Sequence, residues 1–152
     1  MKKKGFTLIE LLIVMAVIAI LIGIAIPAFR GMQDEARKSK AQGDVRVLKI
    51  AVESYYKNHN NAYPTASVAG TTSWQSTLTG ATPRILESAL YDPFGATSTT
   101  EYTFATDTAL TTTAKYYVIF SVGPLTTGTA TISTAGVVST SNEAVWASNG
   151  HE

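Results

Sequence analysis

Cysteine is absent from this chain of 152 residues. Its absence excludes disulfide bonds and thiol catalysis, so a folded domain must be stable through packing alone or with a bound ion. Histidine is also scarce, because His59 and His151 are the only two. Since the second histidine lies in the C-terminal tail, we expect His59 to have no metal-binding or catalytic role.

Motifs that carry catalysis are absent as well. The chain has no glycine-rich phosphate loop and no nucleophile elbow, and no base is placed to activate its many serines. The stretch GMQDEARKSKAQG at residues 31–43 has the composition of a charged helix surface. We therefore expect a protein that is not an enzyme and that has no specific nucleic-acid partner.

A second long hydrophobic run is also missing, which argues against several membrane spans. The run that is present has no charge between Leu11 and Phe29, and as a helix it would be about 28 Å long, close to the thickness of a bilayer core. A secretory signal peptide has a shorter apolar region and ends in an A-x-A-like site, which residues 25–30 lack. The run is therefore predicted to stay on the chain as an anchor for one small domain.

The formal net charge is only +1, but the charges are unevenly distributed. Residues 30–60 carry seven basic and four acidic side chains, whereas residues 61–152 carry two basic and six acidic ones. This difference suits packing between copies or contact with an anionic lipid surface, and ordinary solvated faces also explain it. Lys2, Lys3 and Lys4 favour a cytoplasmic N-terminus, although the basic cluster that begins at Arg30 opposes that orientation.

One acid, Glu10, is the only charged residue between Lys4 and Arg30. Burying a carboxylate in a bilayer is costly unless the charge finds a partner. Two interpretations are open for these residues alone. Either Glu10 lies at the level of the lipid headgroups and reaches water, or it pairs with a positive charge inside an apolar bundle.

The residues around Glu10 resemble a known processing signal. The stretch GFTLIE, which contains Gly5, Phe6 and Glu10, is similar to the type III signal of type IV pilins and of the pseudopilins of type II secretion systems. The resemblance implies that a prepilin peptidase cuts after Gly5 and methylates the new N-terminus, Phe6. Geometry leaves open whether the Phe6 amine pairs with Glu10 of its own chain or of a neighbour. The family places the pair between subunits, and we adopt that hypothesis.

Pro27 lies at the usual position of a proline late in the apolar helix of that family. Because proline has no N–H, the carbonyl of Gly23 loses its helical partner, and glycine itself disfavours a helix by about 1 kcal/mol. The turn from Gly23 to Pro27 is thus predicted to be the weakest of the helix. It is either a passive kink or a segment that stretches when subunits pack together.

A helical period continues beyond the apolar run. Apolar side chains recur at steps of four, three, four and three, at Ala41, Val45, Leu48, Val52 and Tyr55. Three asparagines at 58, 60 and 61 and a Tyr-Pro pair then favour a helix end, since asparagine tolerates the left-handed conformation. One helix is predicted from about residue 6 to about residue 58, with its apolar stripe against a head domain and His59 capping its last carbonyls.

The rest of the chain predicts a head of short helices followed by strands. Thr82 and Pro83 suit the N-cap and first position of a helix that reaches about residue 90. EYTFA alternates like a strand, YYVIFSV is apolar on both faces like a central strand, and weaker strands flank Gly136. The predicted fold class is α+β, a small antiparallel sheet on the long helix. Loops rich in threonine and serine lie at 65–82, 97–100, 106–113 and 126–131.

Three head segments, at 55–64, 91–95 and 116–124, are similar to those of the major pseudopilin of type II secretion, and the lack of cysteine agrees with that branch. The resemblance implies calcium in the loop after the third segment, held by aspartate carboxylates and main-chain carbonyls. Here Leu125 stands where an aspartate is expected. We therefore expect no cofactor, with Asn142 and Glu143 as weak calcium candidates.

Asp92, which precedes a proline, is predicted to form a turn.

The predicted organisation is a leader at 1–5, a transmembrane and filament-core helix at 6–29, its amphipathic continuation at 30–60, and a globular head at 61–152. Phe6, Glu10, Gly23 and Pro27 are the predicted assembly residues.

The resemblance implies a structural subunit of a type II secretion pseudopilus. A type IV major pilin, for adhesion, twitching motility or DNA uptake, and a membrane-anchored binding domain that never polymerises are the alternatives. The implied partners are other copies, the prepilin peptidase, an assembly ATPase with inner-membrane platform proteins, minor pilins or pseudopilins, and the lipid bilayer. The helix would lie in a bacterial inner membrane, with the head in the periplasm or outside the cell.

Overall fold

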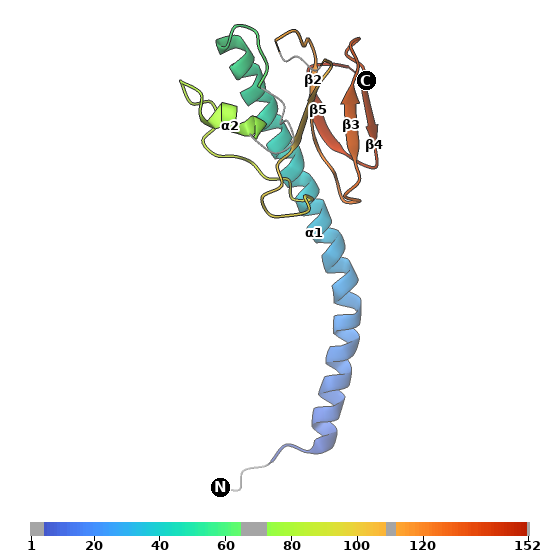
Figure 1. Cartoon of the computed structure of the whole chain (residues 1–152). Helices are drawn as coiled ribbons and strands as arrows, with labels where there is room; N and C mark the ends of the chain where they lie inside the picture. The colour runs from blue at the N-terminus through green and yellow to red at the C-terminus, as the bar shows by residue number, and fades with distance from the viewer. Residues whose placement is uncertain (1–4, 65–72, 109–111, 152) are drawn as a thin grey trace. The chain divides into compact units, whose positions relative to one another are not determined.

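The computed structural model describes residues 5–64, 73–108 and 112–151. The predicted leader lysines at 2–4 and parts of two polar loops, at 65–72 and 109–111, lie outside the described residues. Helix α1 (Leu8–Asn58) is followed by a second helix and the strands (Figure 1). The chain divides into two units, and the second begins at Arg37. The long N-terminal helix is thus confirmed, and it begins two residues later than predicted.

The C-terminal end of α1 is set by the asparagines that follow it. Asn60 and Asn61 have φ angles of 54° and 57°, the left-handed conformation that ends a helix. His59 Nδ1 lies 3.0 Å from the carbonyl oxygen of Tyr55, and the two rings stack with centroids 3.8 Å apart. The predicted helix end and the capping role of His59 are both confirmed.

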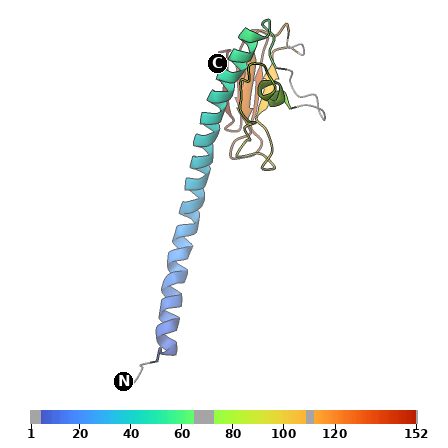
Figure 2. The same ribbon diagram turned by 90° about the vertical axis from the view of Figure 1, so that its left-hand side faces the viewer.

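Within the described residues, five short strands form two antiparallel sheets. The first has the order β1 (Thr103–Thr106), β2 (Tyr117–Ser121) and β5 (Val145–Ser148), and β2 is buried along its whole length. The second pairs β3 (Thr129–Ile132) with β4 (Val138–Ser141). Figures 1 and 2 both show the strands beside the C-terminal part of α1. The α+β class and the central strand are confirmed, whereas β5 was not predicted and one sheet was expected instead of two.

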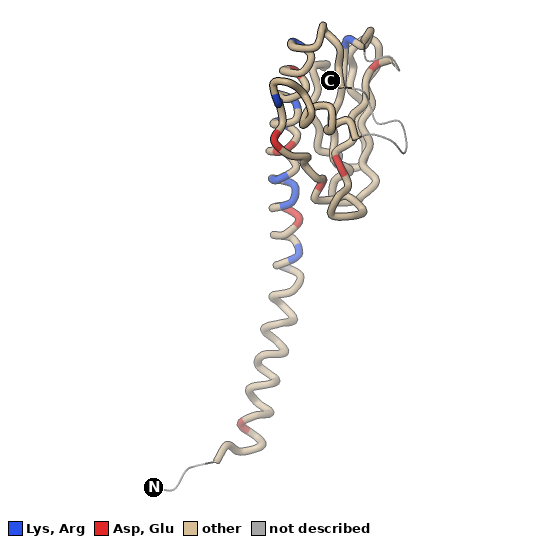
Figure 3. The backbone as a smooth tube through the Cα atoms, turned by 60° about the vertical axis from the view of Figure 1, so that its left-hand side comes forward, with Lys and Arg blue, Asp and Glu red and all other residues tan. Residues whose placement is uncertain are grey.

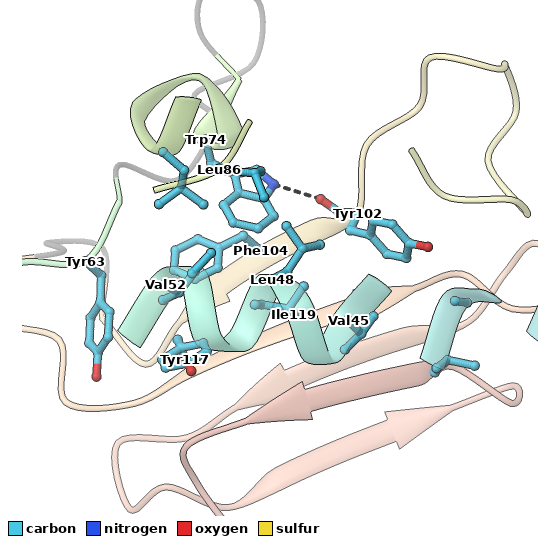
Figure 4. Packing of buried hydrophobic residues seen from close by; sticks show 14 of the residues in the cluster. Val45, Leu48, Val52, Tyr63, Trp74, Leu86, Tyr102, Phe104, Tyr117 and Ile119 are labelled. Carbon is cyan, nitrogen blue, oxygen red and sulfur yellow. Dashed lines mark hydrogen bonds between the residues drawn. The ribbon is translucent and has the colours of Figure 1, made fainter. Parts of the chain in front are cut away.

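The apolar stripe on the second half of α1 forms the core of the head. Its members Ala41, Val45, Leu48 and Val52 are each at most 1% exposed. They pack in one cluster with Ile119 of β2 and with several aromatic side chains (Figure 4). Burial of each large aliphatic side chain contributes roughly 1.5 to 3 kcal/mol, so this stripe is a main source of the stability of the head.

The short helix predicted at residues 83–90 does not form. A six-residue helix, α2 (Trp74–Thr79), lies earlier, and the Ser73 hydroxyl caps it by accepting from the N–H of Gln75 at 3.1 Å. The side-chain amide of Gln75 donates to the carbonyl of Leu90 at 2.8 Å and accepts from its N–H at 2.7 Å. Because a tertiary partner satisfies this backbone, the local preference for a helix is overridden.

Two tyrosine hydroxyls fasten the head to acids on α1. Tyr102 donates to Asp44 Oδ2 at 2.8 Å, and Tyr117 donates to Glu53 Oε1 at 3.2 Å. Burial raises the pKa of both phenols, and it raises the pKa of the Tyr63 phenol to about 12. All three hydroxyls are therefore neutral hydrogen-bond donors at physiological pH.

We expect the head to lose stability above about pH 10. A tyrosine in the unfolded chain has a pKa of about 10. Because the pKa is higher in the folded head, the neutral phenol stabilises the head fully below about pH 10, and this stabilisation is lost as the pH rises through the folded-state pKa. The check is the urea midpoint of unfolding, followed by tryptophan fluorescence up to about pH 12. Tyr102→Phe should make the fall of the urea midpoint with rising pH shallower. Tyr91→Phe, at a ring that is 42% exposed, is the control that should leave it unchanged. A midpoint that stays constant over this range would contradict the role of the buried phenols.

Candidate functional site

The start of α1 is built by two residues of the predicted signal. The backbone N–H and the hydroxyl of Thr7 both donate to Glu10 Oε2, at 2.9 Å and 2.8 Å. In return, the backbone N–H of Glu10 donates to the Thr7 hydroxyl oxygen at 3.3 Å. This reciprocal arrangement is a capping box, in which Thr7 is the N-cap and Glu10 the third helical residue.

The capping box is a role of Glu10 that the sequence reasoning missed. Its signal was present, since Thr7 and Glu10 have the Thr-x-x-Glu spacing ahead of an apolar run. Among the described residues, no donor reaches the other carboxylate oxygen, Oε1. Glu10 can therefore keep its cap and still accept a second donor. Pairing with the Phe6 amine, which the structure of one uncut chain does not test, stays a prediction.

The predicted cleavage point is open to solvent. Phe6 is 79% exposed, and a Cβ built on Gly5 has no atom within 4 Å. Both residues precede the first residue of α1, Leu8. Peptidases act preferentially on exposed segments outside regular structure, so this conformation is compatible with cutting after Gly5.

The first part of α1 exposes a largely apolar surface that contains one acid, Glu10. The large apolar side chains from Phe6 to Phe29 are between 44% and 89% exposed, the extremes being Ile18 and Leu8. Figure 3 shows one isolated acidic position near the N-terminal end of α1, well before the charged part of the helix. In the sequence, the acid is Glu10 and the charged part begins at Arg30. Within the described residues, α1 is the one helix long and apolar enough to cross a membrane. A surface of this kind needs lipid or other apolar helices around it.

The turn at Gly23 and Pro27 is helical in the described chain. α1 continues through Pro27, and a Cβ on Gly23 would meet nothing within 4 Å. Close approach of another helix is therefore sterically open at Gly23. The predicted stretching of this turn would occur only when copies pack together, so it stays a prediction.

Asp92 forms the predicted turn, and its carboxylate also accepts hydrogen bonds from residues at the end of β2. Its Oδ1 accepts from the N–H of Phe94 at 2.9 Å, which closes the turn. The same oxygen accepts from the Ser121 hydroxyl at 2.7 Å, and Oδ2 accepts from the N–H of Val122 at 3.1 Å. The loop is thus tied to the end of β2. Sequence reasoning missed this link because the partners are about 30 residues apart.

The loop after β2 has few side-chain oxygens that could bind calcium. The side-chain nitrogen of Asn142 donates to the carbonyl and hydroxyl oxygens of Thr127, both at 3.3 Å, so a donor already occupies oxygens that a cation would need. The side chain of Leu125 is 60% exposed and, unlike an aspartate, has no oxygen to offer as a ligand. Within the described residues, no group of three or more His, Cys, Asp or Glu side chains could hold a metal. Calcium requires about six to eight oxygen ligands.

We expect chelation of divalent cations to leave the thermal stability of the head unchanged. Asn142 contacts Thr127 directly, and the N–H of Gly128 donates to the carbonyl of Val122 at 2.8 Å, so hydrogen bonds close this loop. Calorimetry with and without EDTA measures the effect, and Asn142→Ala should lower stability by about 0.5 to 1.5 kcal/mol in both conditions. A fall in Tm on chelation that calcium reverses would show that a bound ion is needed.

Comparison with known proteins finds one family model that matches the N-terminal segment. Residues 1–26 match the family model described as the prokaryotic N-terminal methylation motif. That match covers the leader, Gly5, Phe6, Glu10 and most of the apolar run.

Curated relatives of two kinds are similar to the chain. Type II secretion system core protein G of Escherichia coli K12 is 36% identical over 66 residues, which cover 43% of this chain and 45% of the relative. Core protein G of Aeromonas hydrophila is 36% identical over 64 residues, with 42% and 44% covered. Type IV major pilin protein PilE1 of Neisseria gonorrhoeae is 41% identical over 78 residues, with 51% and 36% covered. The chain thus spans less than half the length of these relatives, and no solved structure is significantly similar to it.

Proposed function

We propose that this homologue of type II secretion core protein G and of type IV major pilins is the structural subunit of a type II secretion pseudopilus. The observation that supports this most is the exposed apolar first part of α1, headed by Glu10 inside the methylation motif. Such a surface is stable in lipid before assembly and against the same helix of other copies afterwards. Secretion is favoured over a surface pilus by the three head segments and the absence of cysteine.

The assembly chemistry follows from the N-terminus. A prepilin peptidase cuts after Gly5 and methylates Phe6, and the freed amine is a cation close to Glu10, the single acid of the apolar part of the helix. Removing the charge of one partner of a buried pair typically costs about 3 to 5 kcal/mol. A copy whose amine reaches the Glu10 carboxylate of its neighbour is therefore placed at a defined depth in the bundle, and copies at other depths are disfavoured.

The other partners follow from the same proposal. An assembly ATPase with inner-membrane platform proteins drives the helix out of the bilayer, and minor pseudopilins accompany this subunit in the fibre. The helix lies in the inner membrane and the head in the periplasm. The chain itself performs no catalysis, and its function is mechanical support of protein export.

A type IV major pilin is the second candidate, because the identity to PilE1, 41% over 78 residues, is higher than the 36% over 66 residues to core protein G of Escherichia coli. Both candidates use the same apolar helix. They differ in the reach of the fibre, because a pseudopilus stays in the periplasm and a pilus extends from the cell surface. Electron micrographs of cells that show long surface fibres at native expression, lost on deletion of this chain, would favour the pilin.

Mass spectrometry of the membrane-extracted chain tests processing directly. The expected N-terminus is a methylated Phe6, and electron microscopy of the same preparation should show fibres. An N-terminus at any other residue would reject the processing, and a monomer in cells with a complete secretion system would favour an anchored binding domain.

A further inference from the structure

The head carries a groove of about 370 Å³ between α1 and the turn that joins β4 to β5. Lys38, Gln42 and Arg46 line it from the helix, and Glu143 and Trp146 line it from the other side. Trp146 is half-buried and packs on the second apolar cluster. The groove therefore carries charges of both signs.

The charged side chains that line this groove are not paired with one another or with other described side chains. Arg46 and Glu143 are exposed and Lys38 is half-buried. None of the three has an ion-pair partner among the residues that the structure describes. Two cations on one wall and a carboxylate opposite suit a ligand that brings an acid and a base together.

One segment of the same chain has this complementary pair. Arg84 and Glu87 are both exposed in the loop after α2. Outside the groove, Glu87 is the one exposed carboxylate in the described residues between 61 and 151. Glu87 complements Lys38 and Arg46, and Arg84 complements Glu143.

The groove and this loop lie on opposite sides of α1. Lys40 donates to the carbonyl of Tyr91 at 3.3 Å, so the chain that follows the loop lies along the Lys40 side of the helix. Lys38, in the groove, is two residues away and therefore about 200° around the helix. In Figure 1, α2 and the β3–β4 sheet lie on either side of α1.

We propose that the groove of one copy binds the loop at residues 84–87 of the next copy. This rests on the proposed function, because it needs copies that assemble. A contact between two different surfaces is heterologous, and it repeats along an open filament unless the rotation closes a ring. The contact joins heads through ion pairs and is separate from the bundle of apolar helices.

Disulfide crosslinking tests the contact cleanly, because the chain has no cysteine of its own. Gln42→Cys lines the groove, and Ser88→Cys is exposed beside Glu87. The full chain with both changes, assembled in cells with its export system and oxidised, should give a ladder of linked multimers on denaturing electrophoresis. Either change alone should leave the chain monomeric.

Charge exchange in the double-cysteine chain identifies the groups involved. Arg46→Glu or Glu87→Lys alone should reduce the ladder about tenfold or more through like-charge repulsion, and the two together should restore it. Lys115→Glu, at another exposed base of the head, is the matched control and should leave the ladder intact. Normal fibres without a ladder would overturn this contact alone, whereas absence of fibres from the wild-type chain would overturn the proposed function.

Discussion

Glu10→Ala is expected to abolish fibre assembly while the chain still inserts in the membrane. The substitution removes the one acid of the apolar segment, so the Phe6 amine of a neighbouring copy has no counter-charge in the bundle. The loss of one partner of such a pair, about 3 to 5 kcal/mol per subunit, repeats at every contact along a fibre. Membrane fractionation measures insertion, and electron microscopy of sheared fibres measures assembly.

Glu10→Gln separates charge pairing from helix capping. Glutamine at the third helical position still accepts from the N–H of Thr7, so the capping box is kept while the charge is lost. If pairing drives assembly, Glu10→Gln fails as completely as Glu10→Ala. Thr7→Ala has the opposite design, because it removes the capping hydroxyl and keeps the carboxylate, and it should still form fibres. Abundant fibres from Glu10→Gln would show that capping, and not charge, is what assembly requires.

Leu48→Ala is expected to destabilise the head by about 2 to 5 kcal/mol. Leu48 is fully buried in the cluster that joins α1 to β2, so truncation leaves a cavity lined by its neighbours. Small domains have only about 5 to 15 kcal/mol of stability, and this loss is a large part of it. Urea unfolding of the detergent-extracted chain, followed by the fluorescence of Trp74 and Trp146, measures the effect.

Ile50→Ala is the matched control for that substitution. Ile50 lies on the same helix two residues away and is 69% exposed, so the change should stay within about 0.5 kcal/mol. Similar losses from both variants would contradict the orientation of the apolar stripe.

The parts of the fold with a strong local pattern were predictable from the sequence. The stripe from Ala41 to Tyr55 repeats with the helical period, and Asn60 and Asn61 adopt the left-handed conformation that their chemistry favours. The run at 116–122 is apolar on both faces because β2 has α1 on one side and the second sheet on the other.

The missed elements depend on partners that are distant in sequence. Helix α2 has six residues and is held by the Trp74 indole, whose N–H donates to the carbonyl of Tyr102 at 2.8 Å (Figure 4). Strand β5 pairs with β2, and no local period identifies its four residues. At 83–90 the local signals for a helix were real, but the Gln75 amide takes both backbone groups of Leu90. Local preference is weak when a tertiary hydrogen bond competes with it.

The candidate site was predictable in its residues but not in its hydrogen bonds. Gly5, Phe6 and Glu10 were recognised from a motif, whereas the bonds of Thr7 depend on a spacing that also occurs at ordinary helix starts. Nothing in one sequence shows which copy provides the amine, because that contact is formed only between molecules.

The hydrogen bonds from Thr7 to Glu10 also affect the unassembled subunit while it is in the bilayer. A carboxylate that enters lipid bare loses all the solvation that water gave it, whereas here the same chain replaces part of that solvation with two donors. In the proposed function, these two bonds lower the free-energy cost of keeping an unassembled subunit in the bilayer.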